Sequence, residues 1–186
     1  MVEPDLVNLP ALIDDAKCFA LVRQHRWPEG VRCPFCASPG VIRDGYDETQ
    51  RCRQRYRCKE CAGRFDDLTG TMLAGRHQPL RIWVLCLYFM GLNLSNRQIA
   101  QKLDLSVPDA QVMTDQLRHG LVAITPAAEL EGEVEIDESL LCSWLRPHRG
   151  ISQEKLPDYL GFFQFVHNVR RGGKELLSAL IAALVR

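Results

Sequence analysis

The chain has 186 residues, of which 46% are hydrophobic, so it is globular rather than disordered and can hold one ordinary domain or two to three small ones. Its longest apolar run, residues 82–92, is too short to cross a bilayer, and its acidic N-terminus lacks the apolar core of a signal peptide. We therefore expect a cytoplasmic protein with no membrane partner, in a reducing compartment that suits its eight cysteines.

The formal net charge is zero, but the charge is unevenly spread. Seven Lys or Arg and four acidic residues lie between Arg43 and Arg64, whereas six carboxylates and no basic residue lie between Glu129 and Glu138. The basic segment indicates contact with phosphates. A solvated hairpin face explains this charge equally well.

Residues 10–26 are predicted to form the first helix. Pro10 can occupy its first turn, and the apolar residues that follow recur at helical spacing. The segment RWPEG ends this helix and leads to the first pair of cysteines.

Two CxxC pairs follow, with 21 residues between them. Two such knuckles supply the four soft ligands of a tetrahedral zinc site, and the Pro and Gly residues beside them suit tight turns. A site closed by four thiolates is structural rather than catalytic, because it leaves no position for water. Redox-active pairs or disulfides are the alternative. The predicted zinc ligands are Cys33, Cys36, Cys58 and Cys61.

Between the knuckles, residues 41–46 and 51–58 have the pattern of two strands. In the second, four arginines occupy every other position, so a strand would place them all on one face. Arginine binds phosphate through a bidentate fork, and that face could follow a nucleic-acid backbone. The predicted DNA-binding residues of this segment are Arg51, Arg53, Arg55, Arg57 and Lys59.

Residues 79–92 are predicted to form an apolar helix, and residues 94–121 a pair of helices. Ser95 with Gln98 matches a capping box at the start of one helix, and Ser106 with Asp109 can cap the next. Two short helices joined by a tight turn suggest a helix-turn-helix, although the presumed recognition helix offers only Arg118 and His119 as basic residues. Arg118 is the further predicted DNA contact, and a plain helical bundle is the alternative interpretation.

In the segment GEVEIDE, apolar and acidic residues alternate, and residues 133–138 are predicted to form a strand. A carboxylate at the end of a strand is a common Mg²⁺ ligand. Taken by itself, however, this segment is better interpreted as an acidic strand that faces solvent. A helix capped by Ser152 and running to His167 follows, with His167 packed at its edge rather than acting as a ligand. The apolar residues 175–185 form a last helix that must bury itself in this chain or a partner.

The order of these motifs resembles that of the DDE transposases of bacterial insertion sequences that begin with a zinc ribbon. The resemblance rests on RWPEGVRCPFCAS, RYRCKECAGRFDDLTGT, SNRQIAQKLDLS and EGEVEIDES, which together span residues 10–139. It implies an RNase H-like domain in which Asp, Asp and Glu, or Asn and Glu, hold divalent metal for two-metal phosphodiester chemistry. It places the first catalytic aspartate on Asp137.

The chain departs from this family after Asp137. Only 49 residues follow, whereas an RNase H-like domain needs on the order of a hundred. The segment LRPHRGISQEKLPDYLGFFQFVHN resembles the C-terminal helix of the family, so we expect an internal deletion with its junction near residues 140–144. No motif assigns Glu138, Glu154 or Asp158 as the missing ligands.

The expected fold is α+β: a small zinc ribbon, a helix-turn-helix helical unit, and the first strand and C-terminal helices of an RNase H-like domain. The expected segments are 1–30 (N-terminal helix), 31–70 (ribbon), 71–125 (helical unit) and 126–186 (remnant). Structural Zn²⁺ is the expected cofactor, with Mg²⁺ only if an active site is completed.

We expect a bacterial, transposase-like protein that binds transposon ends or non-specific duplex DNA and cannot cut or join strands alone. Its other expected partners are a second copy of itself or an intact transposase. The alternatives are a DNA-binding regulator that competes with intact transposase, and a decayed fragment without function.

Overall fold

The structure is a computed structural model that describes residues 14–124, 138–148, 150–171 and 175–185. It contains two compact units, one formed by Met1–Val84 with Leu184–Arg186 and the other by Leu85–Ala183. We call them the ribbon unit and the helical unit. Within the described residues, no helix is both long and apolar enough to cross a membrane.

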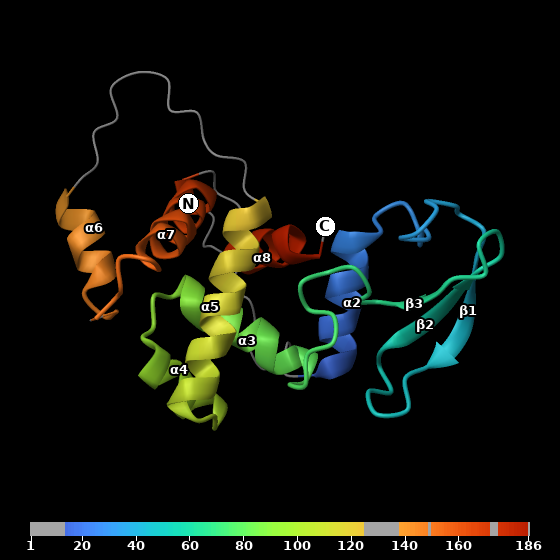
Figure 1. Ribbon diagram of the computed structural model, residues 1–186, viewed down its shortest axis with the longest axis horizontal. Helices are drawn as coiled ribbons and strands as arrows, with labels where there is room; N and C mark the ends of the chain where they lie inside the picture. Colours follow the sequence, from blue (N-terminus) through green and yellow to red (C-terminus); the bar gives the residue numbers. More distant parts are fainter. Residues whose placement is uncertain (1–13, 125–137, 149, 172–174, 186) are drawn as a thin grey trace, which may run out of the picture. The chain divides into compact units, whose positions relative to one another are not determined.

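The ribbon unit begins with helix α2, Asp15–Arg26, as the sequence predicted for these positions (Figure 1). Asp14 caps it, because its carboxylate accepts a hydrogen bond of 2.9 Å from the backbone N–H of Ala16. Its buried face carries Cys18, Phe19 and Val22. Residues 10–13 of the predicted helix lie outside the described part of the chain.

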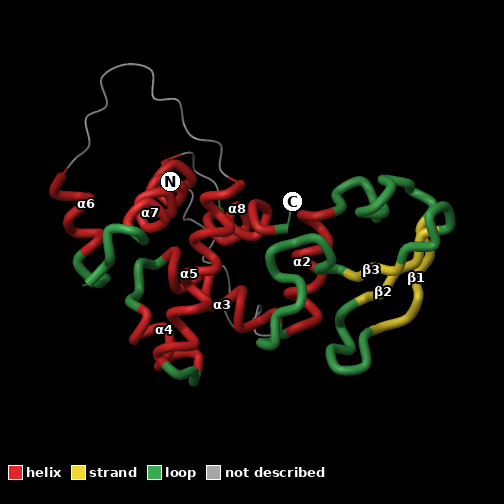
Figure 2. Tube along the Cα trace, in the orientation of Figure 1, coloured by secondary structure: helices red, strands yellow, loops and turns green. Residues whose placement is uncertain are grey.

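A three-stranded antiparallel sheet follows, with strand order β1-β2-β3 (Figure 2). The strands are β1 Val41–Tyr46, β2 Gln54–Cys58 and β3 Arg64–Asp66. β1 is irregular between Arg43 and Tyr46, where Gly45 has a φ of 77° that glycine adopts without strain. The sheet and its cysteine pairs confirm the predicted ribbon.

Strand β2 starts three residues later than the sequence predicted. Residues 47–53 form the turn from β1 instead: Asp47 N–H donates to the Arg53 carbonyl, and Arg53 N–H donates to the Gln50 carbonyl. The Asp47 carboxylate fixes this turn by accepting hydrogen bonds from Thr49 and from the backbone N–H of Gln50. The alternating arginines therefore run through a turn before they enter the strand.

Helix α3, Leu80–Gly91, crosses from the ribbon unit into the helical unit. The helical unit continues with α4 Asn96–Leu103, α5 Val107–Ile124, α6 Glu138–Leu145, α7 Leu156–Arg171 and α8 Leu176–Leu184. The capping box of α4 is present as predicted, because Ser95 Oγ accepts from the N–H of Gln98 while Gln98 Oε1 accepts from the N–H of Ser95. Asp104 ends α4 in the left-handed conformation, and Ser106 caps α5.

The core of the helical unit is apolar and centres on α5. Buried residues of α5 are Ala110, Met113, Leu117 and Leu121, and those of α4 are Ile99, Ala100 and Leu103. Helix α7 packs closely against α5, because a Cβ on Gly161 would lie only 2.6 Å from Val122 Cγ2. This close approach shows why residue 161 carries no side chain.

The predicted fourth segment, 126–186, is described in part, from residue 138 onward. The strand expected at 133–138 lies outside the described residues up to 137, and Glu138 begins α6. The expected junction at 140–144 lies inside that helix. Asn93 donates to the Trp144 carbonyl, and Arg170 donates to the Gly91 carbonyl. These bonds join α6 and α7 to the end of α3, so the C-terminal helices belong to the helical unit.

Candidate metal centre and nucleic-acid interface

The two cysteine knuckles have the same backbone geometry. Cys33 N–H donates to the Ser38 carbonyl at 3.0 Å, and Cys58 N–H donates to the Gly63 carbonyl at 2.9 Å, five residues on in each case. Alanine follows the second cysteine of both pairs in the left-handed conformation, with φ of 58° at Ala37 and 57° at Ala62. The repeated turn directs both cysteines of each pair toward one point.

The four sulfur atoms converge as the sequence predicted. The Sγ atoms of Cys33, Cys36, Cys58 and Cys61 all lie within 4.8 Å of one another. Cys33 and Cys61 are 3.6 Å apart, as are Cys36 and Cys58. A tetrahedral site with Zn–S bonds of about 2.3 Å requires sulfurs about 3.8 Å apart. The cluster therefore fits a structural Zn²⁺, and Cys52 is not part of it.

The thiols differ in acidity. The pKa of Cys58 is lowered from 9.0 to about 7, first by the backbone N–H of Cys61 and then, against desolvation, by the N–H of Glu60. The Ser38 N–H lowers the pKa of Cys36, but desolvation and the neighbouring sulfurs outweigh it and raise that pKa to about 12. Zinc binding requires thiolates and displaces these protons, so the bound metal is part of the folding free energy of the ribbon.

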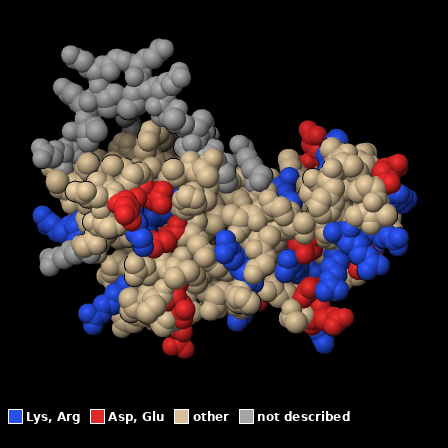
Figure 3. Space-filling model, in the orientation of Figure 1, with Lys and Arg blue, Asp and Glu red and all other residues tan. Residues whose placement is uncertain are grey.

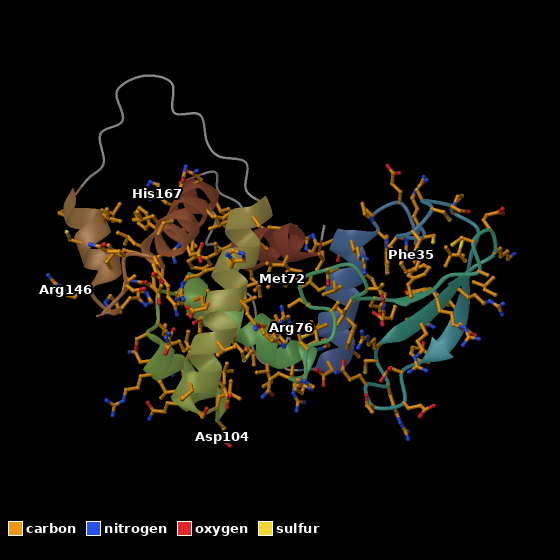
Figure 4. All side chains as sticks on the ribbon, viewed as in Figure 1. Phe35, Met72, Arg76, Asp104, Arg146 and His167 are labelled. Carbon is orange, nitrogen blue, oxygen red and sulfur yellow. The ribbon has the colours of Figure 1, made fainter. Side chains whose placement is uncertain are left out.

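An aromatic cluster lies beside the metal site. Tyr56 and Phe65 are buried and stack with ring centroids 5.3 Å apart, and the Trp27 ring meets Tyr56 edge-on at 5.4 Å. Phe35, labelled in Figure 4, is 61% exposed, and a Cβ on Gly63 would lie 2.8 Å from its ring. Residue 63 must therefore be small for the second knuckle to close against the first.

A buried carboxylate ties α2 to the ribbon, and no sequence motif pointed to it. Asp67 is fully buried and accepts hydrogen bonds from Arg23 Nε at 3.0 Å, the N–H of Gln54 at 2.7 Å and the Tyr56 hydroxyl at 3.0 Å. Arg26 donates to the Asp67 carbonyl at 2.7 Å and also to the Thr69 carbonyl. These contacts hold α2 against the loop that follows β3 and against the start of β2.

The solvent-facing side of the sheet carries a row across all three strands. Arg57 pairs in register with Ile42 of β1 and with Arg64 of β3, so these three side chains lie on one face. All three are exposed, with the Arg64 side chain at 76%. Figure 3 shows Lys and Arg side chains gathered over the sheet, with Asp and Glu side chains among them. Arg64 was missing from the predicted set, since its position opposite Arg57 depends on the pairing of β2 with β3.

The predicted arginines are not equivalent in the structure. Arg53 forms an ion pair of 2.8 Å with Asp66, and Arg55 one of 2.7 Å with Asp47. Bonds from the Thr49 hydroxyl and from Arg55 hold the pKa of Asp47 well below its usual value. Arg51 is exposed in the turn. Arg57 and Lys59 are exposed, and neither side chain has a hydrogen-bond or ion-pair partner within the described residues. Arg57 and Lys59 are therefore open to solvent on this sheet and at its end, and Arg64 is exposed with one long contact of 3.8 Å to Asp44.

Arg118 is enclosed in the helical unit, where only 1% of its surface is exposed. Its guanidinium lies 3.8 Å from the centre of the Tyr159 ring and 3.4 Å from Asp115. Burial lowers the pKa of this arginine. The guanidinium of Arg118 is therefore enclosed between α5 and α7 and is not available at the surface.

The open side of α5 carries little positive charge. Val112 is 55% exposed, and the His119 side chain is 80% exposed and lies 3.7 Å from Asp158. Arg118 is the only Lys or Arg of this helix. The predicted catalytic Asp137 lies outside the described residues. Within the described part of the chain, the four cysteines form the only group of three or more potential metal ligands.

Comparison with known proteins agrees with this metal centre. Residues 13–64 match the family described as "Transposase zinc-ribbon domain". The chain is 36% identical over 134 residues to a protein of Halobacterium salinarum described as "Uncharacterized protein in transposable element ISH50". No solved structure matches the chain. The predicted transposase-type zinc ribbon is thus confirmed, and the chain is similar to a protein of an insertion element.

The similarity covers unequal shares of the two proteins. It spans 72% of this chain but 44% of the Halobacterium protein, so the chain spans less than half the length of that relative. That organism is an archaeon, and the bacterial origin expected from the sequence stays a prediction.

Proposed function

We propose that the protein binds duplex DNA of an insertion element through the solvent-facing side of its zinc-ribbon sheet. The observation that carries this proposal is the row formed by Arg57 and Arg64, paired in register on an exposed face, with Lys59 one residue beyond the end of β2. This face belongs to the domain that matches the transposase zinc ribbons. Transposon ends and non-specific duplex are the two candidate DNA targets.

The chemistry of this face suits phosphates. Arg57 has no competing carboxylate within the described residues, and Arg64 is only loosely paired, 3.8 Å from Asp44. Guanidinium groups bind phosphate oxygens in a bidentate manner, and they lose little side-chain conformational entropy for each hydrogen bond that they form. Because the protein has no net charge, binding depends on this local surface rather than on a general attraction to polyanions.

Helices α4 and α5 of the helical unit would supply a DNA contact of their own, of the helix-turn-helix type. Their capped ends and the short turn from Asp104 to Ser106 support this assignment. The exposed residues of α5, including Val112 and His119, offer contacts to bases rather than charge for phosphates. In this arrangement the ribbon supplies most of the electrostatic affinity, and α5 supplies any sequence preference.

We also propose that this chain does not cleave DNA strands by itself. Two-metal chemistry needs several converging carboxylates, and the sequence matches the transposase pattern at Asp137 only. Mg²⁺ would be a cofactor only if further acidic residues completed the site. Competition with an intact transposase for the same DNA is the regulatory alternative, and a decayed fragment is the other.

DNA binding can be tested with a labelled duplex, by fluorescence anisotropy over a range of salt concentrations. Each phosphate contact contributes about 0.9 to the slope of log affinity against log salt. The double variant Arg57→Glu, Arg64→Glu should bind more weakly and lose about 2 from that slope. Lys17→Glu, an exposed change on α2 of the same unit, is the matched control and should leave the slope unchanged. Equal slopes for the double variant and the control would refute this interface.

The same samples with Mg²⁺ or Mn²⁺ test for cleavage. We expect intact DNA strands after incubation with the wild-type chain. Cleavage that disappears in Asp137→Ala would show a working active site and contradict the second part of the proposal. Addition of the chain to an intact transposase should reduce its end cleavage if the regulatory alternative holds.

A further inference from the structure

Two adjacent hollows lie in the helical unit, between the N-terminal end of α4 and the segment that connects α6 to α7. Their volumes are about 470 and 560 Å³, and both are lined by Ser95 and Pro147. We call them together the α4 groove. Ligand sites in proteins commonly have volumes of about 300–1,000 Å³, so the groove is large enough for a segment of a polymer backbone.

The charged residues that line the α4 groove are all basic. Arg97 and Lys155 line the first hollow, and Arg146 lines the second. No Asp or Glu is among the described residues that line either one. Arg97 and Arg146 are exposed, and their guanidinium groups have no hydrogen-bond or ion-pair partner within the described residues. Figure 4 labels Arg146 at the end of α6.

Both polar and apolar side chains line the groove beside these cations, and the apolar ones include Leu92, Leu94 and Ile151. Ser95, Asn96, Gln111 and Ser152 contribute hydroxyl and amide groups. His148 is neutral, because burial and then the charge of Arg118 lower its pKa to about 4. Lys155 is paired with Asp115, which fixes the ammonium at the edge of the hollow. The N-terminal end of α4 adds the favourable end of its dipole.

We propose that the α4 groove is a second DNA-binding site, which holds a stretch of phosphodiester backbone with Arg97 and Arg146. This inference rests on the proposed binding of duplex DNA by the chain, but it uses residues of the helical unit rather than those of the ribbon. Gln111 of α5 lines the groove, so a backbone held there passes beside the first turns of α5. The exposed Val107 and Val112 of α5 would then be close to the bases.

The test compares two charge reversals on the same helix. Arg97 and Lys102 are both exposed on α4, but only Arg97 lines the groove. In the full-length, zinc-loaded protein, Arg97→Glu and Arg146→Glu should each lower the slope of log affinity against log salt by about 1, measured with the labelled duplex. Lys102→Glu should leave it unchanged. Cooperative thermal unfolding of all three variants would show that they fold.

The outcomes separate this inference from the proposed function. If the wild type binds DNA but Arg97→Glu and Arg146→Glu match Lys102→Glu, the α4 groove is refuted while ribbon binding stands. If the groove variants lose slope while Arg57→Glu, Arg64→Glu does not, the groove stands without the ribbon interface. A wild type that does not bind DNA refutes both. Stabilisation by inorganic phosphate that is lost in Arg97→Glu, without any effect on DNA affinity, would identify a small-anion site and overturn the DNA assignment.

Discussion

The ribbon unit and the helical unit reach stability by different routes. The sheet of the ribbon has a small aromatic core around Tyr56 and Phe65, and its loops are fixed by four sulfur atoms and the buried Asp67. The helical unit has a larger apolar core along α5, and its described residues form no group of three or more potential metal ligands. A small core cannot offset the conformational entropy of long loops, so the ribbon depends on its ligands in a way that the helices do not.

The buried charges of the two units differ as well. Asp67 in the ribbon unit is paired with Arg23 and receives two further hydrogen bonds. Arg118 in the helical unit has a long contact with Asp115, and its Nε has no hydrogen-bond partner within the described residues. The neutral state of the nearby His148 avoids a second positive charge there. The stability of the ribbon unit therefore depends on the Asp67 carboxylate. The stability of the helical unit depends on His148 remaining unprotonated.

Removal of zinc should have the largest effect on stability, and it should separate the behaviour of the two units most clearly. Apparent binding free energies of structural zinc sites are about 10–16 kcal/mol near neutral pH, so a chelator or Cys58→Ser should unfold the ribbon. Amide NMR signals of residues 33–66 should collapse, while those of residues 96–121 should remain dispersed. Cys142→Ser, an exposed thiol on α6, is the control and should change neither set. Simultaneous loss of both sets would show that the helical unit depends on the ribbon.

Substitution of Asp67 should have the next largest effect on the free energy of unfolding. Asp67→Ala leaves Arg23 without its buried partner and removes acceptors from Gln54 and Tyr56, and loss of one member of such a pair costs about 3–5 kcal/mol. Asp44→Ala removes an exposed carboxylate with one long contact and should cost under about 1 kcal/mol. Urea unfolding of the zinc-loaded ribbon measures both. Similar midpoints for the two variants would contradict the central role of Asp67.

Protonation of His148 should produce the smallest effect, and it acts on the helical unit. The pKa of His148 falls from 6.5 to about 4 in the folded protein, first through burial and then through Arg118. The unfolded chain therefore binds a proton at a higher pH than the folded chain does. The stability contributed by neutral His148 is present in full above about pH 6.5 and is lost as the pH falls toward about 4, with an upper bound of about 3 kcal/mol.

The variant His148→Gln isolates this contribution. It cannot gain a proton, so its stability should change less than that of the wild type between about pH 7 and about pH 5. Urea unfolding followed by far-UV circular dichroism at the two pH values measures the difference. The groups that face the imidazole include Asn93, which bonds to Nε2 at 2.9 Å, and the rings of Tyr159 and Trp144, whose centroids lie 5.2 and 5.3 Å from that of His148. Identical pH responses would show that His148 does not control acid sensitivity.

Local patterns predicted local structure well. The CxxC spacing identified all four zinc ligands, because a knuckle is formed by a few consecutive residues. Ser95 with Gln98 located the start of α4 for the same reason. The alternation of arginines from Arg51 to Arg57 predicted the start of β2 less reliably, because that strand begins at Gln54. The Asp47 carboxylate accepts from the backbone N–H groups of Thr49 and Gln50 and so fixes a turn that extends to Arg53, where Arg53 N–H donates to the Gln50 carbonyl.

The amino-acid sequence alone determined the zinc ligands and the caps of α4 and α5, since each depends on residues close together in the chain. Only the tertiary structure decided which charges are available. It buried Arg118 against Tyr159, paired Arg53 with Asp66, and placed Arg64 beside Arg57. It also brought Arg97 and Arg146 to one groove, 49 positions apart in sequence. The free energy of a charged side chain depends on neighbours from distant segments, which no local spacing specifies.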